Sequence, residues 1–142
     1  MIGDGPDRLA AEQLCRKYGI SNKVKFLGKL KLIENILSFA DIFILPSETE
    51  SFGLVALEAM ASRTVVISTN SGGLPEVNLD MKTGYLSNVG DIEKMSKDVC
   101  NLLSDNELLK KMKNNAFEHS KSFDLPNILP QYEEIYNKLL KK

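Results

Sequence analysis

The segment from residue 42 to residue 61 constrains the fold of this chain most strongly. It begins with a short apolar and β-branched run, Ile42–Leu45, which is typical of a buried parallel strand. After a turn over residues 51–53, apolar residues repeat at helical spacing through Leu54–Ala61. Open α/β sheets bind ligands in loops of this kind, between the carboxyl end of a strand and the N-terminus of a helix. The segment therefore predicts an α/β fold with a binding site in this loop.

The rest of the chain alternates in the same way. Short β-branched runs predict strands, and apolar residues at helical spacing predict helices, with Asp91 and Asp105 as N-caps of two of them. The pattern predicts strands over 24–27, 65–67 and 83–86, helices over 7–18, 33–40, 92–103, 108–116 and 125–140, and one helical turn within 72–77. This order favours a Rossmann-like, doubly wound parallel sheet with a helical C-terminal tail. The 142 residues, 43% of them hydrophobic, are consistent with one domain over residues 1–142.

Composition excludes several classes of partner. The net charge is −1 with acids and bases interspersed, which gives no electrostatic case for nucleic acid or an anionic membrane. No apolar run approaches the roughly 20 residues of a transmembrane helix, and no signal peptide is visible. Cys15 and Cys100 fall in helical patterns, which suggests buried free thiols in a reducing compartment. We therefore expect a cytoplasmic protein.

Two carboxylates flank the start of the predicted helix. Glu50 and Glu58 lie eight residues apart, and both could be ordinary solvated acids, one of them favoured by the helix dipole. However, Glu58 lies within an otherwise apolar helix, where a carboxylate normally needs a partner. A nucleotide diphosphate could place its phosphates on the amides of residues 52–54, its ribose diol on Glu58 and its attached group on Glu50.

The remaining motifs are less specific. Gly72 and Gly73 would allow a ligand to approach the backbone closely, and an ordinary turn is an equally good interpretation. Gly28 and Leu30 follow a predicted strand and could hold a base through main-chain groups. His119 is the only histidine and is expected at the surface. The sequence has neither metal-ligand spacing nor an assembled nucleophile, so no metal is predicted.

Several segments, in this order, resemble the C-terminal half of the retaining GT-B glycosyltransferases of family four. They are residues 3–6, 24–28, 50–61, 72–77 and 83–86. Within this family, residues 47–55 are most similar to the branch that transfers N-acetylglucosamine to malate in bacillithiol biosynthesis. At the end of the 54–61 helix, Arg63 stands where the family usually has glycine, so we expect it to adopt a left-handed or altered cap.

The resemblance implies a role for each site residue. Glu50 would be the catalytic residue that contacts the donor sugar, and Glu58 would hold the ribose hydroxyls. The backbone of Ser51, Phe52, Gly53 and Leu54 would bind the diphosphate, and the main chain near Gly28 and Leu30 would face the base. The resemblance implies UDP as the nucleotide, and no metal or other cofactor is expected.

The resemblance also implies what the chain lacks. Residues 1–142 would be the donor-binding fragment, and the amino-terminal, acceptor-binding domain would be a missing partner. The whole enzyme would transfer a sugar such as N-acetylglucosamine to a small acceptor such as malate, and the fragment alone would be inactive. Two alternatives remain open: a non-catalytic module that binds nucleotide sugars, and a fragment of a GT-B nucleotide-sugar epimerase.

Overall fold

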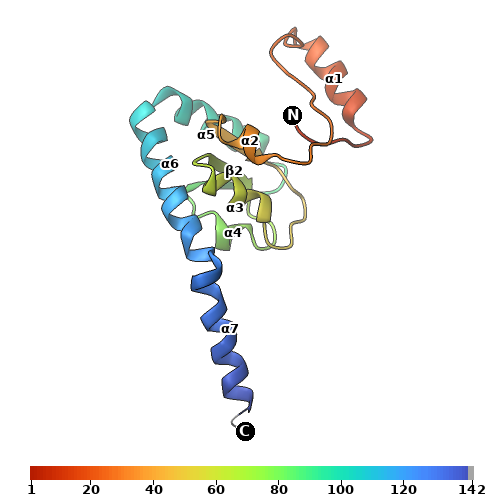
Figure 1. Ribbon diagram of the computed structural model, residues 1–142. Coiled ribbons are helices and arrows are strands. Elements are labelled where there is room, and N and C mark those ends of the chain that lie inside the picture. Colours follow the sequence, from red (N-terminus) through yellow and green to blue (C-terminus); the bar gives the residue numbers. More distant parts are fainter. Residues whose placement is uncertain (141–142) are drawn as a thin grey trace. The chain divides into compact units, whose positions relative to one another are not determined.

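The computed structural model describes residues 1–140, which form two compact units (Figure 1). Unit 1 comprises Met1–Ile33, and unit 2 begins at Glu34. The interpretation of residues 1–142 as one domain stays a prediction. The elements in chain order are α1 (Arg8–Lys17), α2 (Glu34–Leu37), β1 (Ile42–Leu45), α3 (Leu54–Ala61), β2 (Val65–Thr69), α4 (Leu74–Val77), β3 (Gly84–Ser87), α5 (Ile92–Ser104), α6 (Asn106–Ser120), the 3-10 helix η1 (Lys121–Phe123) and α7 (Leu125–Leu140).

Unit 2 is built on a parallel sheet of three strands in the order β1-β2-β3. The register pairs Ile44 with Ile67 and Ile67 with Tyr85. The helix α3 joins β1 to β2, and α4 joins β2 to β3, as parallel strands require a crossover between them. Every residue of β2 is buried, because it is the central strand. The predicted parallel α/β sheet is confirmed, with β1 and α3 at the predicted bounds.

Helices cover both faces of this sheet. On one face, Val65 and Ile67 of β2 join a buried cluster with residues of α5 and α6, namely Met95, Leu102, Leu109 and Met112. The side chain of Ser68, one step along the pleat, points to the opposite face and contacts Asn78, just after α4. The helix α3 packs against β1, β2 and α4. The doubly wound arrangement is therefore confirmed.

A buried amide joins the two strands β2 and β3. Asn78 has no exposed surface, and its Nδ2 atom donates to the carbonyl oxygens of Val66 and Tyr85, each at 3.1 Å. Its Oδ1 atom accepts a hydrogen bond of 3.1 Å from the Thr83 hydroxyl. Next to it, a Cβ atom on Gly84 would lie 1.9 Å from the Val66 carbonyl oxygen. Glycine is therefore required where β3 begins.

The C-terminal helices follow the sequence prediction closely. The carboxylate of Asp91 accepts a hydrogen bond from the backbone of Lys94, and that of Asp105 accepts one from Leu108, both at 2.9 Å. Both predicted N-caps are confirmed. The helix α7 runs through Pro130 without interruption and contributes no buried residue to unit 2. It continues from α6 and η1 and extends away from the sheet (Figure 1).

Three expectations about local structure were wrong. Residues 24–27 form no regular strand, because their backbone pairs with single residues near the start of the chain and not with a neighbouring strand. There, Met1 exchanges hydrogen bonds with Lys25 and Leu27, and Gly3 forms one antiparallel bridge with Gly28. The predicted helix over 33–40 is a single turn, α2. Cys100 is exposed and Cys15 is half-buried, so the expectation of two buried thiols was also wrong.

Arg63 adopts the left-handed conformation expected where glycine is missing. Its φ angle is +60°, which is costly for a residue with a side chain. The guanidinium compensates by stacking 3.9 Å from the centre of the Phe117 ring and donating to Asn114 Oδ1 at 2.9 Å. Met81 has a similar φ angle of +59°, but its side chain is 74% exposed. Only Arg63 therefore gains side-chain contacts that offset its backbone strain.

The difference between Arg63 and Met81 predicts that substitution by glycine changes the stability of the protein differently at the two positions. Met81→Gly should raise the free energy of unfolding by about 0.5–1 kcal/mol, because it relieves a left-handed backbone and loses little packing. Arg63→Gly should gain less or lose stability, because it removes the stacking on Phe117 and the bond to Asn114. Urea unfolding of the two variants measures both values. A larger gain for Arg63→Gly than for Met81→Gly would contradict this account.

Candidate functional site

The loop between β1 and α3, residues 46–53, is fastened to the loop that follows β2. The Thr69 hydroxyl donates to the Ser47 carbonyl oxygen at 2.6 Å, and the Ser71 hydroxyl donates to that of Glu48 at 2.8 Å. Both hydroxyls come from the carboxyl end of the central strand or just beyond it. The path of the 46–53 loop is therefore fixed by side chains of the neighbouring crossover.

Two glycines allow the same loops to touch through their backbones. A Cβ atom on Gly72 would lie 1.6 Å from the Glu50 carbonyl oxygen. One on Gly73 would lie 2.9 Å from both the Cα atom of Phe52 and the carbonyl oxygen of Ser51. Gly72 also has a φ angle of +55°. The backbone that lies so close to Gly72 and Gly73 belongs to the candidate site. These glycines therefore position Glu50, Ser51 and Phe52.

The N-terminus of α3 opens into this loop. Gly53 precedes the helix with a φ angle of +96°, and its carbonyl oxygen accepts hydrogen bonds from Ala56 and Leu57. Among the described residues 1–140, no side chain caps α3, whereas Asp91 and Asp105 cap α5 and α6. The first amides of α3 therefore lie at the positive end of the helix with no capping carboxylate, which suits an anion.

Glu58 lies at the surface of α3. It lies on the exposed stripe of α3 with Leu54 and Ala61, while Ala59 and Met60 face the interior. Because Glu58 is exposed, its carboxylate can be solvated without a partner in the chain, and its role toward a ligand stays a prediction. Glu50 is half-buried in the loop. Within residues 1–140, neither carboxylate makes an ion pair or hydrogen bond, so both can accept hydroxyl groups of a ligand.

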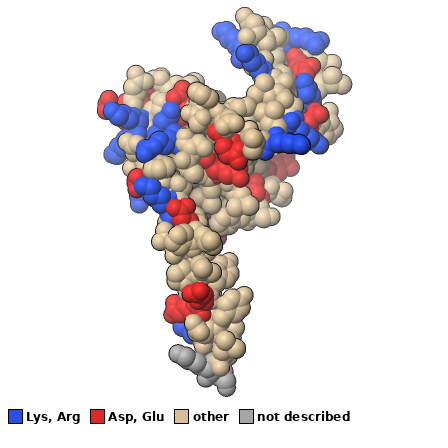
Figure 2. Space-filling view, in the orientation of Figure 1, with Lys and Arg blue, Asp and Glu red and all other residues tan. Residues whose placement is uncertain are grey.

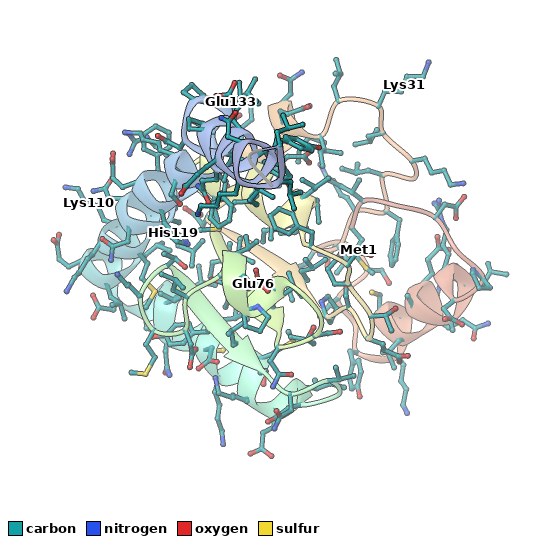
Figure 3. All side chains as sticks on the ribbon, turned by 90° about the horizontal axis from the view of Figure 1, so that it is seen from below. Met1, Lys31, Glu76, Lys110, His119 and Glu133 are labelled. Atoms are coloured by element: carbon teal, nitrogen blue, oxygen red, sulfur yellow. The ribbon has the colours of Figure 1, made fainter. Side chains whose placement is uncertain are left out.

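An aromatic contact that sequence reasoning missed supports the loop. The rings of Phe52 and Phe123 meet edge to face with centroids 6.1 Å apart, and His119 meets Phe123 in the same way at 5.4 Å. His119 is labelled in Figure 3. Its Nε2 atom is buried and has no hydrogen-bond partner in the described part of the chain, so the expectation of a simple surface histidine was wrong. No local spacing could have predicted the contact between Phe52 and Phe123, because these two residues lie far apart in the sequence.

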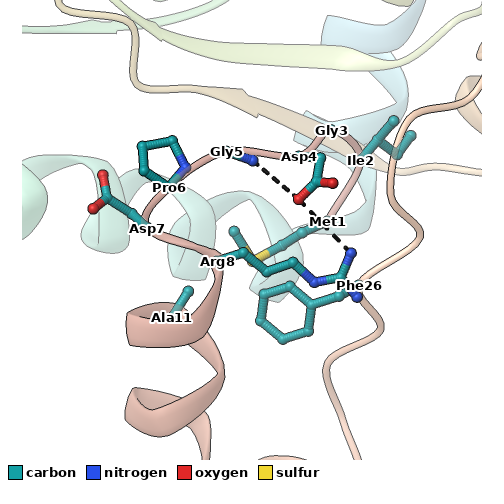
Figure 4. A pocket seen from close by; sticks show the side chains of 10 residues that line it. All are labelled: Met1, Ile2, Gly3, Asp4, Gly5, Pro6, Asp7, Arg8, Ala11 and Phe26. Atoms are coloured by element: carbon teal, nitrogen blue, oxygen red, sulfur yellow. Dashed lines mark hydrogen bonds and ion pairs between the residues drawn. The ribbon is translucent and has the colours of Figure 1, made fainter.

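Unit 1 contains the other two predicted site residues. Gly28 has a φ angle of +67°, its carbonyl oxygen accepts a hydrogen bond of 2.8 Å from Gly3, and Leu30 is 38% exposed. Figure 4 shows the adjoining turn, in which Asp4 accepts a hydrogen bond from Gly5 and lies 3.9 Å from the Arg8 guanidinium. This turn lines a cavity of about 390 Å³. That Gly28 and Leu30 share one site with Glu50 stays a prediction.

The described part of the chain, residues 1–140, has neither a metal-binding cluster nor a membrane-spanning helix. Among them, no group of three or more histidine, cysteine, aspartate or glutamate side chains could hold a metal ion. No helix in that range has both the length and the apolar character needed to cross a membrane.

Comparison with known proteins places the chain in a family. Residues 1–119 match the family described as "Glycosyl transferases group 1". The N-acetyl-alpha-D-glucosaminyl L-malate synthase of Bacillus anthracis is 41% identical over 142 residues, which cover 99% of this chain. The chain spans only 37% of that relative's length.

Solved structures agree with this assignment and with the GT-B fold. HepE of Anabaena, solved in complex with UDP-glucose, is 26% identical with a TM-score of 0.83, over 96% of this chain and 40% of that one. The C-terminal domain of a glycosyl transferase group 1 protein, LpcC of Francisella tularensis, is 30% identical with a TM-score of 0.74. That match covers 83% of this chain and 64% of the other. By sequence and by fold, the chain belongs to the glycosyl transferases group 1 family.

Proposed function

We propose that residues 1–142 form the donor-binding half of a retaining glycosyltransferase that uses a nucleotide diphosphate sugar. The observation that carries this proposal is the uncapped N-terminus of α3 beneath a loop held by Gly72 and Gly73. Such an arrangement suits a diphosphate, because backbone amides and the helix dipole both favour negative charge there. Membership of the glycosyl transferases group 1 family agrees with a sugar diphosphate as the ligand.

The proposed roles follow the positions of the residues. The backbone of Ser51, Phe52, Gly53 and Leu54 binds the diphosphate, and Glu58 on the exposed stripe of α3 accepts the ribose hydroxyls. Glu50 is the proposed catalytic residue and contacts the donor sugar. The main chain at Gly28 and Leu30 is proposed to face the base.

The identity of the donor and acceptor is proposed from the relatives. HepE was solved with UDP-glucose, which supports UDP as the nucleotide. The Bacillus anthracis relative is named for N-acetylglucosamine and L-malate, which supports that sugar and that acceptor. Under this proposal no metal or other cofactor takes part. The α3 amides stabilise the charge that develops on the leaving diphosphate, which is the part of catalysis that this chain supplies.

Retention of the anomeric configuration is proposed to follow attack from the same face that the leaving group vacates. In that geometry the departing phosphate takes the proton of the attacking acceptor hydroxyl, so no separate histidine base is required. The glycosidic carbon–oxygen bond to phosphate breaks as the bond to the acceptor oxygen forms. Glu50 would orient the sugar during this exchange, and the α3 N-terminus would hold the phosphate in place.

An amino-terminal half that carries the acceptor is the proposed partner, since the chain spans only 37% of the Bacillus anthracis relative. The cytoplasm is the proposed location, because both cysteines are free thiols. The competing proposal is a module that binds nucleotide sugars without catalysis. It is supported by the same observation, that the chain spans only 37% of the Bacillus anthracis relative. An epimerase fragment would need acid and base residues beside the sugar.

The first test is donor binding. UDP-N-acetylglucosamine should bind the chain, and Glu58→Ala should weaken binding about 10- to 100-fold, because a carboxylate that accepts two hydroxyls is lost. Calorimetry measures both dissociation constants. The matched control is Glu107→Ala, which removes another exposed helical glutamate from α6. Equal affinity for the native chain and Glu58→Ala would refute the role of Glu58.

The second test concerns the two touching loops. Gly72→Ala should reduce donor affinity at least about tenfold, because the new methyl group must displace the Glu50 carbonyl oxygen. It should also lower the urea midpoint. Gly5→Ala is the control, since a Cβ atom there meets nothing within 4 Å. Unchanged donor affinity in a folded Gly72→Ala variant would show that binding does not depend on this loop.

The third test separates a transferase from a binding module. The chain is mixed with a separately prepared amino-terminal half of the Bacillus anthracis relative, and formation of glycosylated malate from UDP-N-acetylglucosamine is followed. Product that depends on both components, and that disappears with Glu50→Ala, is the expected result. Donor binding without any product in the mixture would favour the binding module.

A further inference from the structure

Charge is distributed very unevenly along this chain. The stretch between Glu12 and Glu34 contains six basic residues and no acidic residue: Arg16, Lys17, Lys23, Lys25, Lys29 and Lys31. All 19 acidic residues and the other 12 basic residues lie outside it, so this stretch carries +6 and the rest of the chain −7. The net charge of −1 therefore hides a strongly basic segment within unit 1.

The structure of unit 1 turns part of this segment into an exposed row. The amino group of Met1 donates a hydrogen bond to the Lys25 carbonyl oxygen, and the Met1 carbonyl oxygen accepts one from Leu27, which keeps residues 24–27 extended. In an extended chain successive side chains alternate, and here Val24 and Phe26 are half-buried while Lys23, Lys25 and Leu27 are exposed. The Phe26 ring lies beneath the Arg8 guanidinium of α1, 5.9 Å away. We call the four exposed lysines of this segment the lysine row: Lys23, Lys25, Lys29 and Lys31.

Asp4 lies near the lysine row and lines a hollow together with Lys29, but its ion pair is with Arg8. No lysine of the row takes part in an ion pair within residues 1–140. Lys31 points away from the ribbon in Figure 3, and basic side chains are visible over unit 1 in Figure 2. Two leucines of the same segment that have no role in the proposed function are also exposed, Leu27 by 42% and Leu32 by 65%. Unit 1 therefore presents positive charge and aliphatic side chains together.

We infer that the lysine row binds the anionic surface of a lipid bilayer. The four lysines are spread over nine residues and offer several separate positive charges, which suits an array of headgroups better than a single phosphate group. Lysines gain from the surface potential of anionic lipids, and exposed leucines beside them enter the boundary between headgroups and acyl chains. A nucleic acid offers phosphates but no comparable place for leucine side chains, so the lipid surface fits better.

The acidic remainder of the chain does not prevent this interaction. At physiological salt, charges more than about 8 Å apart are largely screened, so a bilayer that contacts the lysine row responds mainly to the nearest charges. The attraction is thus a local property of unit 1. It is independent of donor binding by Glu58 and the loop of unit 2.

The test is co-sedimentation of the 142-residue chain with vesicles of phosphatidylcholine alone or mixed with phosphatidylglycerol. The chain should bind only the anionic vesicles, and high salt should release it. The triple variant Lys23→Gln, Lys25→Gln, Lys31→Gln should bind about 100-fold more weakly, since each lysine near such a surface contributes about fivefold. It leaves Lys29 intact, next to the predicted base-binding residues.

The matched control removes three exposed lysines of unit 2: Lys82→Gln, Lys110→Gln, Lys111→Gln. It changes the net charge equally and should alter vesicle binding less than about twofold. If the first triple variant does not fold by circular dichroism, the single variants Lys23→Gln and Lys31→Gln should each show the fivefold loss. Three results would overturn the inference: no binding of the native chain to anionic vesicles, an equal loss in both triple variants, or tighter binding to single-stranded RNA than to vesicles. Donor affinity, measured separately, tests only the proposed function.

Discussion

The candidate site depends on one close approach between two backbones. Gly72 and Gly73, after the central strand, touch the chain at Glu50, Ser51 and Phe52 with no room for a side chain between them. The hydroxyls of residues 69 and 71 hold the same two loops together. Since the loop of residues 46–53 leads directly into α3, this contact sets both the direction of the helix N-terminus and the place of Glu50.

The sheet brings these two loops together in the first place. The strands β1 and β2 are parallel neighbours, so the loops that follow them emerge at the same edge. On the other side of β2, Asn78 and the glycine at the start of β3 fix the third strand against it through buried hydrogen bonds. A polar network that is fully buried and satisfied is rigid. The candidate site is therefore formed by loops, while its geometry comes from the sheet beneath them.

How far the sequence could predict this structure depends on the range of the interaction concerned. Hydrophobic periodicity predicted β1 and α3 at their observed bounds, and local chemistry predicted the caps at Asp91 and Asp105. The left-handed Arg63 was also predictable, because a missing glycine leaves few conformations for a helix end. The prediction of a strand over 24–27 was wrong, because a strand needs a neighbouring strand to pair with, and hydrophobic periodicity does not show whether one is present. The contact of Phe52 with Phe123 leaves no signal in local spacing, since it joins distant parts of the chain.

The charge around the loop limits what this half of the site can do with a diphosphate. Four glutamates lie in or beside the touching loops and α3, namely Glu48, Glu50, Glu58 and Glu76. None of them is paired with a lysine or arginine within residues 1–140. The N-terminus of a helix supplies about half a positive charge, which offsets only part of the charge of a diphosphate. Under the proposed function, the remaining positive charge must therefore come from cations beyond these loops.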